Sequence, residues 1–257
     1  MSPNITDYLA QHKMARITGG LFLAYILVSV LATVLGQIGL GDAQQVYQAI
    51  VTNEASFRLG LVAALLTGFL FLATAWGLYV LLRPVNRDLA LLFLVLNAVG
   101  VAIQGASLLS LVSAMLQGGA ESHMQAYSAA QLEGLAYLSI NVYKVGFVTA
   151  QLFFGTWLFP LGYLVYKSGF LPRFLGVLLL LDGIAVLIWF LQALLLPDLP
   201  AIRYPGLAVS FVAEVGLALW LLVRGIKVVD SGAVRVTREP VPAHRSRAWV
   251  WSRPAVA

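Results

Sequence analysis

Residues 174–196, FLGVLLLLDGIAVLIWFLQALLL, contain a single charged side chain, Asp182, in an otherwise almost wholly apolar stretch. At about 1.5 Å per residue, a helix of this length crosses the roughly 30 Å hydrocarbon core of a bilayer. The whole chain of 257 residues has the same character, with 60% hydrophobic and only 11% charged residues. A soluble fold could not bury that much apolar surface, so the sequence predicts a protein embedded in a membrane.

Five more apolar runs accompany this one, and together they predict an all-α, polytopic bundle of six transmembrane helices. The first run is too long for the apolar part of a signal peptide and no clear small-x-small cleavage site follows it, so we expect it to remain as a span. The predicted spans are residues 17–38, 57–82, 89–116, 135–166, 174–196 and 205–223.

The basic residues predict the orientation of these spans. On the side that holds both termini and the turns 83–87 and 167–173 lie 13 of the 16 Lys and Arg residues. Cytoplasmic loops are enriched in Lys and Arg, so both termini are expected in the cytoplasm. The domains are then a cytoplasmic N-terminal segment (1–16), a six-helix transmembrane domain (17–223) and a basic cytoplasmic tail (224–257).

Strongly polar side chains are expected at membrane depth, in its middle and outer half. Counted from the cytoplasmic basic residues, Asp182, Glu214 and Asn97 lie about 14–15 Å into the membrane, near its midplane. By the same count Gln104 and Gln151 lie at about 25 Å, in the outer half. The cytoplasmic half is nearly free of such groups.

Helical spacing groups these residues into faces that should point into the bundle, because exposing them to lipid would cost several kcal/mol. Asn97 and Gln104 share one face, Asn141, Lys144 and Gln151 a second, and Arg203, Ser210 and Glu214 a third. We interpret them as a polar vestibule that opens to the outside. The candidate ligand- or proton-binding residues are Asp182, Glu214, Asn97, Gln104, Gln151, Asn141, Lys144 and Arg58.

Asp182 and Glu214 lie at similar depths on consecutive antiparallel spans. Burial disfavours the charged form of a carboxyl group, and two neighbouring carboxyls can share a proton or hold a cation. Three interpretations stay open: a proton or cation role, hydrogen bonding that joins helices, and contact with a ligand. Depth alone does not establish that the two groups face each other.

Chemical motifs are missing from the sequence. The chain has no cysteine, and its three histidines are too scattered to predict a metal site. There is no nucleophile elbow, zinc-protease motif, phosphate-binding loop or dinucleotide fingerprint. The sequence therefore predicts no catalytic residues, no cofactor and no metal, and an intramembrane enzyme is a minority interpretation.

The segment after the sixth span predicts a mostly disordered, basic tail. Its Trp249 and Trp251 stand among arginines, and such a segment either rests on anionic lipid headgroups or is simply solvated. Because the net charge of +5 comes from residues at the ends of apolar runs, it indicates a membrane partner and not nucleic acid. The oligomeric state is open.

Three stretches resemble a bacterial membrane family, the domain of unknown function 4386. They are FRLGLVA at 57–63, LLRPVNRDLALL at 81–92 and PLGYLVYKSGFLPRFLG at 160–176. The resemblance covers roughly residues 13–225 and excludes the tail. It implies a multi-pass protein of the bacterial cytoplasmic membrane, and it implies neither an activity nor site residues.

Three functions remain as hypotheses. The first is a protein that binds or transports a small ligand or ion from the outer face through the polar vestibule. The second is a non-catalytic accessory or sensor subunit, in which polar residues join helices and the tail meets lipid or a partner. The third is an intramembrane enzyme.

Overall fold

The computed structural model describes residues 5–118 and 127–226, and every regular element within these ranges is a helix. Six of the helices are long and apolar enough to cross a membrane, which confirms the prediction of a six-span, all-α membrane protein. The elements are α1 (Ile5–Gly36), α2 (Ala43–Thr52), α3 (Glu54–Leu82), α4 (Arg87–Gly118), α5 (Ala129–Lys167), α6 (Arg173–Leu195), a 3-10 turn (Pro200–Ile202) and α7 (Arg203–Val223).

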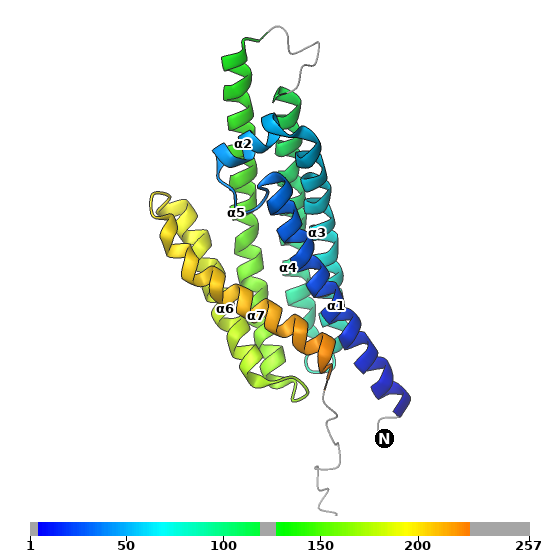
Figure 1. The fold of residues 1–257 in the computed structure, drawn as a ribbon. Coiled ribbons are helices and arrows are strands. Elements are labelled where there is room, and N and C mark those ends of the chain that lie inside the picture. The colour runs from blue at the N-terminus through cyan, green and yellow to red at the C-terminus, as the bar shows by residue number, and fades with distance from the viewer. Residues whose placement is uncertain (1–4, 119–126, 227–257) are drawn as a thin grey trace, which may run out of the picture.

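The arrangement of the helix ends agrees with the predicted orientation. The beginning of α1 and the end of α7 lie on the same side of the bundle as the short α3–α4 and α5–α6 turns (Figure 1). These are the segments that carry the excess of Lys and Arg, and we refer to this side as the cytoplasmic side, which is what the positive-inside rule predicts. Most of the predicted tail, residues 227–257, lies outside the described residues.

The short helix α2 was not anticipated from hydropathy, because it is amphipathic and too short to span a bilayer. Asp42 and Gln45 form a capping box at its start, in which each side chain accepts a hydrogen bond from the other residue's backbone N–H. Val46 and Ile50 are buried beneath it. Tyr47 stacks on Tyr137 of α5 with ring centroids 4.7 Å apart, so α2 braces the outer end of that helix.

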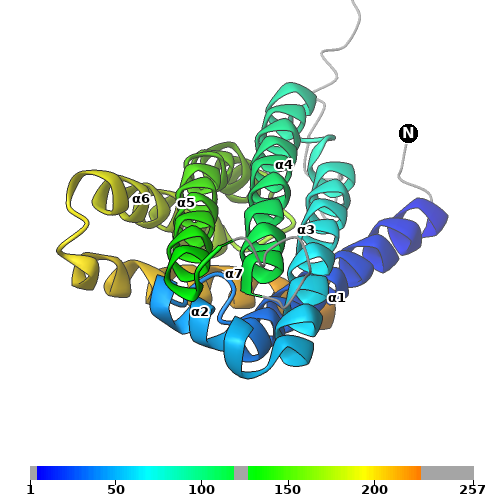
Figure 2. The same ribbon diagram turned by 90° about the horizontal axis from the view of Figure 1, so that it is seen from above.

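The six spans form a closed ring. Each contacts its neighbours in the order α1, α3, α4, α5, α6 and α7, and α7 returns to contact α1 (Figure 2). The helix α7 crosses the bundle obliquely, from the outer end of α6 to the cytoplasmic half of α1 (Figure 1). The ring encloses space that side chains of all six helices can reach.

Glycines allow the closest helix approaches in this ring. A Cβ atom added to Gly19 of α1 would lie 2.5 Å from the Leu222 nitrogen of α7, which is closer than any Cβ can sit. In the α5–α6 hairpin, Gly162 faces Gly176 and Gly155 faces Gly183, each near the other's carbonyl oxygen. Small residues at contacts between membrane helices let the backbones pack directly against each other.

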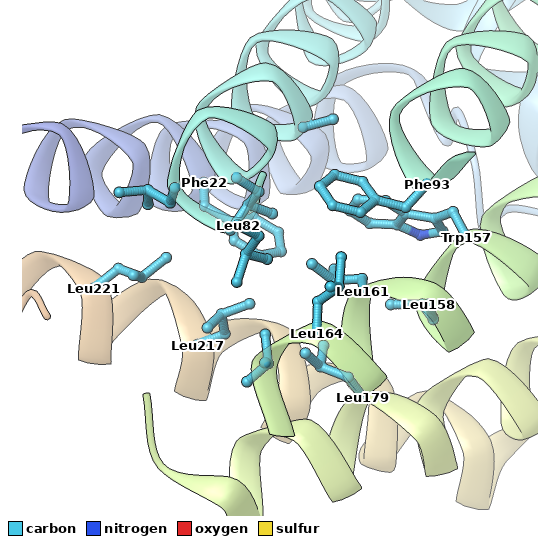
Figure 3. Close-up of a cluster of buried hydrophobic side chains, with 14 of the residues drawn as sticks. Phe22, Leu82, Phe93, Trp157, Leu158, Leu161, Leu164, Leu179, Leu217 and Leu221 are labelled. Carbon is cyan, nitrogen blue, oxygen red and sulfur yellow. The ribbon is translucent and has the colours of Figure 1, made fainter. Parts of the chain in front are cut away.

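The largest apolar core fills the cytoplasmic half of the ring. Phe22, Leu82, Leu161, Leu217 and Leu221 converge there from α1, α3, α5 and α7 (Figure 3). Outward-facing side chains are apolar as well, as for Phe69, Leu109 and Leu195, which are exposed on the bundle surface. An apolar exterior of this extent is expected where lipid is the solvent.

Candidate functional site

A cavity of about 490 Å³ lies inside the ring, and each of the six spans lines part of it. Its walls are mainly apolar. The polar residues that line it are spread over five helices: Tyr25, Ser29 and Thr33 on α1, Thr67 on α3, Gln104 on α4, Gln151 on α5, and Ser210 with Glu214 on α7. A mostly apolar pocket with a few convergent polar groups is typical of small-molecule sites.

Aromatic side chains close the cavity towards the cytoplasm. Phe71 lies edge-on to Trp157, with centroids 5.1 Å apart, and contacts Phe154 at 5.2 Å. All three residues line the cavity and also belong to the core beneath it, in which Trp157 is drawn in Figure 3. The cavity therefore rests on dense apolar packing.

Asp182 and Glu214 are brought to one level of the bundle. Asp182 is fully buried on α6, and its Oδ1 accepts a hydrogen bond from the Ser210 hydroxyl of α7. Glu214 follows Ser210 by one helical turn and lines the cavity. The other carboxyl oxygen of Asp182 has no hydrogen-bond partner among the described residues. Ser210 thus connects the buried carboxyl of α6 to the cavity wall.

Removing the Ser210 hydroxyl is expected to destabilise the fold. The variant Ser210→Ala leaves both oxygens of the buried Asp182 carboxyl without a protein partner, which should lower the free energy of unfolding by about 1–2 kcal/mol. Ser29→Ala is the matched control, because the Ser29 hydroxyl bonds only to the Ile26 carbonyl of its own helix. Thermal unfolding of the purified variants measures both. Equal effects would contradict a special role for the Ser210–Asp182 bond.

A second pocket, of about 360 Å³, adjoins the cavity on its outer side. The two share Gly39, Phe147 and Trp189 in their linings. The polar residues of this outer pocket are Asn141, Lys144, Gln192 and Arg203. The cavity and the outer pocket contain most of the residues assigned to the predicted vestibule, and the opening of that vestibule to the outside stays a prediction.

The predicted candidates fall into four groups by position. Gln104, Gln151 and Glu214 line the cavity, Asn141 and Lys144 line the outer pocket, Asp182 adjoins the cavity through Ser210, and Asn97 and Arg58 lie apart. Arg58 pairs with Glu54 on the exposed surface, at 2.6 Å.

Asn97 is fully buried, and its amide atoms have no hydrogen-bond partner in the described chain. At this level α4 and α5 are packed tightly, since a Cβ atom on Gly100 would lie 2.6 Å from the Phe154 ring. Asn97 is not among the residues that line the cavity, which its helix reaches two turns further on, at Gln104.

Arg203 and Gln192 are the polar residues of the outer pocket that the candidate set lacked. The sequence did carry a signal for Arg203, because it precedes Ser210 by seven residues and Glu214 by eleven, which places all three on one face of α7. The aromatic residues Phe147 and Trp189, which separate the two pockets, gave no such signal, because aromatic residues are frequent throughout the spans.

Comparison with known proteins gives one family and one relative. The profile of the family described as "Domain of unknown function (DUF4386)" matches residues 17–225. A protein of Archaeoglobus fulgidus named "Uncharacterized protein" is 31% identical over 175 residues, which cover 66% of this chain and 86% of that protein. No solved structure matches the chain.

Proposed function

The chain belongs to the DUF4386 family, and we propose that it is a multi-pass protein of the cytoplasmic membrane that binds a small ligand reaching it from the outer face. The binding site is the cavity within the helix ring, together with the outer pocket that adjoins it on its outer side. Glu214, Gln104 and Gln151 supply the polar contacts. The aromatic residues Phe71, Phe154 and Trp157 prevent the ligand from passing towards the cytoplasm while the ring holds this conformation.

The observation that carries this proposal is the cavity that all six spans build together. Its volume of about 490 Å³ lies within the roughly 300–1,000 Å³ of typical small-molecule sites. A space of this size supports a molecular ligand better than a bare ion. Polar residues that served only to join helices would be bonded between helices, whereas Gln104 and Glu214 face the cavity.

Glu214 and Asp182 add a proton- or cation-binding role to the proposal. A carboxyl group that faces the cavity is available to a ligand's cationic or hydroxyl group, and the neighbouring Ser210–Asp182 bond can reorganise with it. In a transport cycle this pair would be where ligand binding is coupled to a proton or cation.

Single cysteines test whether the cavity is accessible from outside, because the native chain has none. We expect Gln104→Cys and Gln151→Cys to react in intact cells with the membrane-impermeant reagent 2-sulfonatoethyl methanethiosulfonate. Asn141→Cys, at the rim of the outer pocket, serves as the positive control. Leu161→Cys, fully buried in the cytoplasmic-half core, should stay unmodified.

If the cysteine at 141 reacts while those at 104 and 151 stay unmodified, the cavity is closed to the outside. The proposed route for the ligand would then be wrong.

A further inference from the structure

The outer pocket is lined by two cations, and an acid that interacts with one of them, Asp42 beside Lys144, lies outside its lining. Lys144 and Arg203 both line it, and none of its lining residues is Asp or Glu. The Lys144 ammonium donates to the Gly41 carbonyl, and Arg203 lies over the Tyr204 ring at 5.6 Å. The Arg203 Nε is buried and has no hydrogen-bond partner in the part of the chain that the structure describes. An ammonium has three donors and a guanidinium five, so several donors in this pocket are free for an anion.

The cavity that adjoins this cationic pocket is mainly apolar. Phe147 and Trp189 form the wall between the outer pocket and this cavity. A small hydrophilic anion held by Lys144 and Arg203 would leave that cavity unfilled. An anion with an apolar tail would satisfy the cations and fill the cavity at once.

The cavity also opens sideways, towards lipid. The helices α1 and α7 are in contact at their cytoplasmic ends, where the Arg16 Nε donates to the Leu222 carbonyl over 3.1 Å. Further out, Val30, Val34 and Phe211 line the cavity and are nevertheless 54%, 68% and 64% exposed on the bundle surface. Val30 and Val34 follow Arg16 by about 21–27 Å along α1, and Phe211 precedes Arg224 by about 20 Å along the oblique α7. All three lie on the outer side of the Arg16–Leu222 contact. The cavity therefore communicates with the outer leaflet between α1 and α7.

From these three observations we infer that the ligand is an amphipathic anion, with a carboxylate or phosphate head at Lys144 and Arg203 and an apolar tail in the cavity. The tail enters between α1 and α7 from the outer leaflet, while the head stays at the level of the outer pocket. This inference rests on the proposed function and names its ligand class. Free fatty acids and anionic phospholipids share the required chemistry.

Tryptophan quenching tests the inference, because Trp157 and Trp189 line the cavity. The full chain, with its other four tryptophans replaced by phenylalanine, is placed in phosphatidylcholine nanodiscs. One arm titrates 9,10-dibromostearate, and the other incorporates a dibrominated phosphatidylglycerol. We expect saturable quenching that the unbrominated compound reverses. Quenching by the first probe identifies a free fatty acid as a sufficient ligand, and quenching by the second alone identifies a membrane phospholipid.

Variants separate specific binding from partitioning into the bilayer. Lys144→Gln with Arg203→Gln should weaken the apparent affinity about tenfold or more, since both head-group cations are lost. Arg58→Gln removes an outer cation that lies on the exposed surface, and it should leave the affinity unchanged. If the double variant fails to fold, Ser29→Phe, which fills the cavity and leaves the head-group site intact, should abolish saturable quenching.

Failure of the proposed ligand class can be distinguished from failure of the proposed binding cavity. Absence of saturable quenching with both probes, or an unchanged affinity in the double variant, would overturn the amphipathic anion as ligand. If the cysteines at 104 and 151 still react from outside, the ligand-binding cavity itself stands. If they do not react, the proposed function fails as well.

Discussion

Replacing Gly19 by valine is expected to break the contact between α1 and α7 and to open the helix ring. The added Cβ would lie 2.5 Å from the Leu222 nitrogen and 2.7 Å from the Ala218 carbonyl oxygen. Both are backbone atoms of α7, so no side-chain rotation relieves the clash and the helices must separate. Overpacking costs about 1–3 kcal/mol in well-packed proteins, and we expect the upper end of that range here. Thermal unfolding of the purified protein in detergent should show a clear fall in Tm.

The adjacent Gly20 provides the matched control. A Cβ there would meet only the Leu222 Cδ1, at 3.9 Å, which is ordinary van der Waals contact. Gly20→Val carries the same change in helix propensity one residue along the same helix, so it should leave Tm nearly unchanged. If Gly19→Val is as stable as Gly20→Val, the ring is not closed at Gly19.

The second large effect is expected in the α5–α6 hairpin, from Gly162→Val. A Cβ at this position would lie 2.9 Å from the Gly176 carbonyl oxygen and 3.1 Å from the Leu180 nitrogen. The two helices meet backbone to backbone along this line, so α6 must move away from α5. Asp182 lies on the moving helix, so the hydrogen bond from Ser210 should be strained too. A loss of about 3 kcal/mol is expected, measured by thermal unfolding.

Gly134 controls for the valine itself, because it lies in the same helix and a Cβ there meets nothing within 4 Å. We expect Gly134→Val to unfold at nearly the wild-type temperature. A comparable fall in both variants would mean that valine weakens α5 generally, and the close glycine contact would not be the cause.

Hydropathy predicted the spans well because lipid imposes a simple length requirement on each helix. The predicted ends differ most from the structure where a helix leaves the hydrocarbon. Thus α1 begins at Ile5, well before the predicted residue 17, and α5 begins at Ala129 instead of 135. The polar residues of these extensions remain helical outside the membrane, where an apolar-run criterion does not detect them. For α2, the Asp42 and Gln45 spacing of a capping box was a usable signal.

For the site, the sequence could predict only which residues share a face of a single helix. Spacing along α7 correctly placed Ser210 and Glu214 on one inward face, since a helix has a fixed period. Which helix that face meets depends on how α7 crosses the bundle, and this is why the Ser210–Asp182 bond could not be foreseen. Asn97 illustrates the same limit. It shares a helix face with Gln104, seven residues further on, yet only Gln104 lines the cavity, and Gly100, packed against Phe154, lies between them in the sequence.

The closure of the ring has a consequence for biosynthesis. Most neighbours in the ring are consecutive along the chain and can pair as soon as each hairpin has been inserted. The contact between α1 and α7 is different, because Arg16 and Leu222 are 206 residues apart. At 5–20 residues per second, the ribosome needs roughly 10–40 s to bridge that interval. Throughout this time the flank of α1 that carries Gly19 faces lipid or the insertion machinery, and the cavity has no wall on that side until the sixth span arrives.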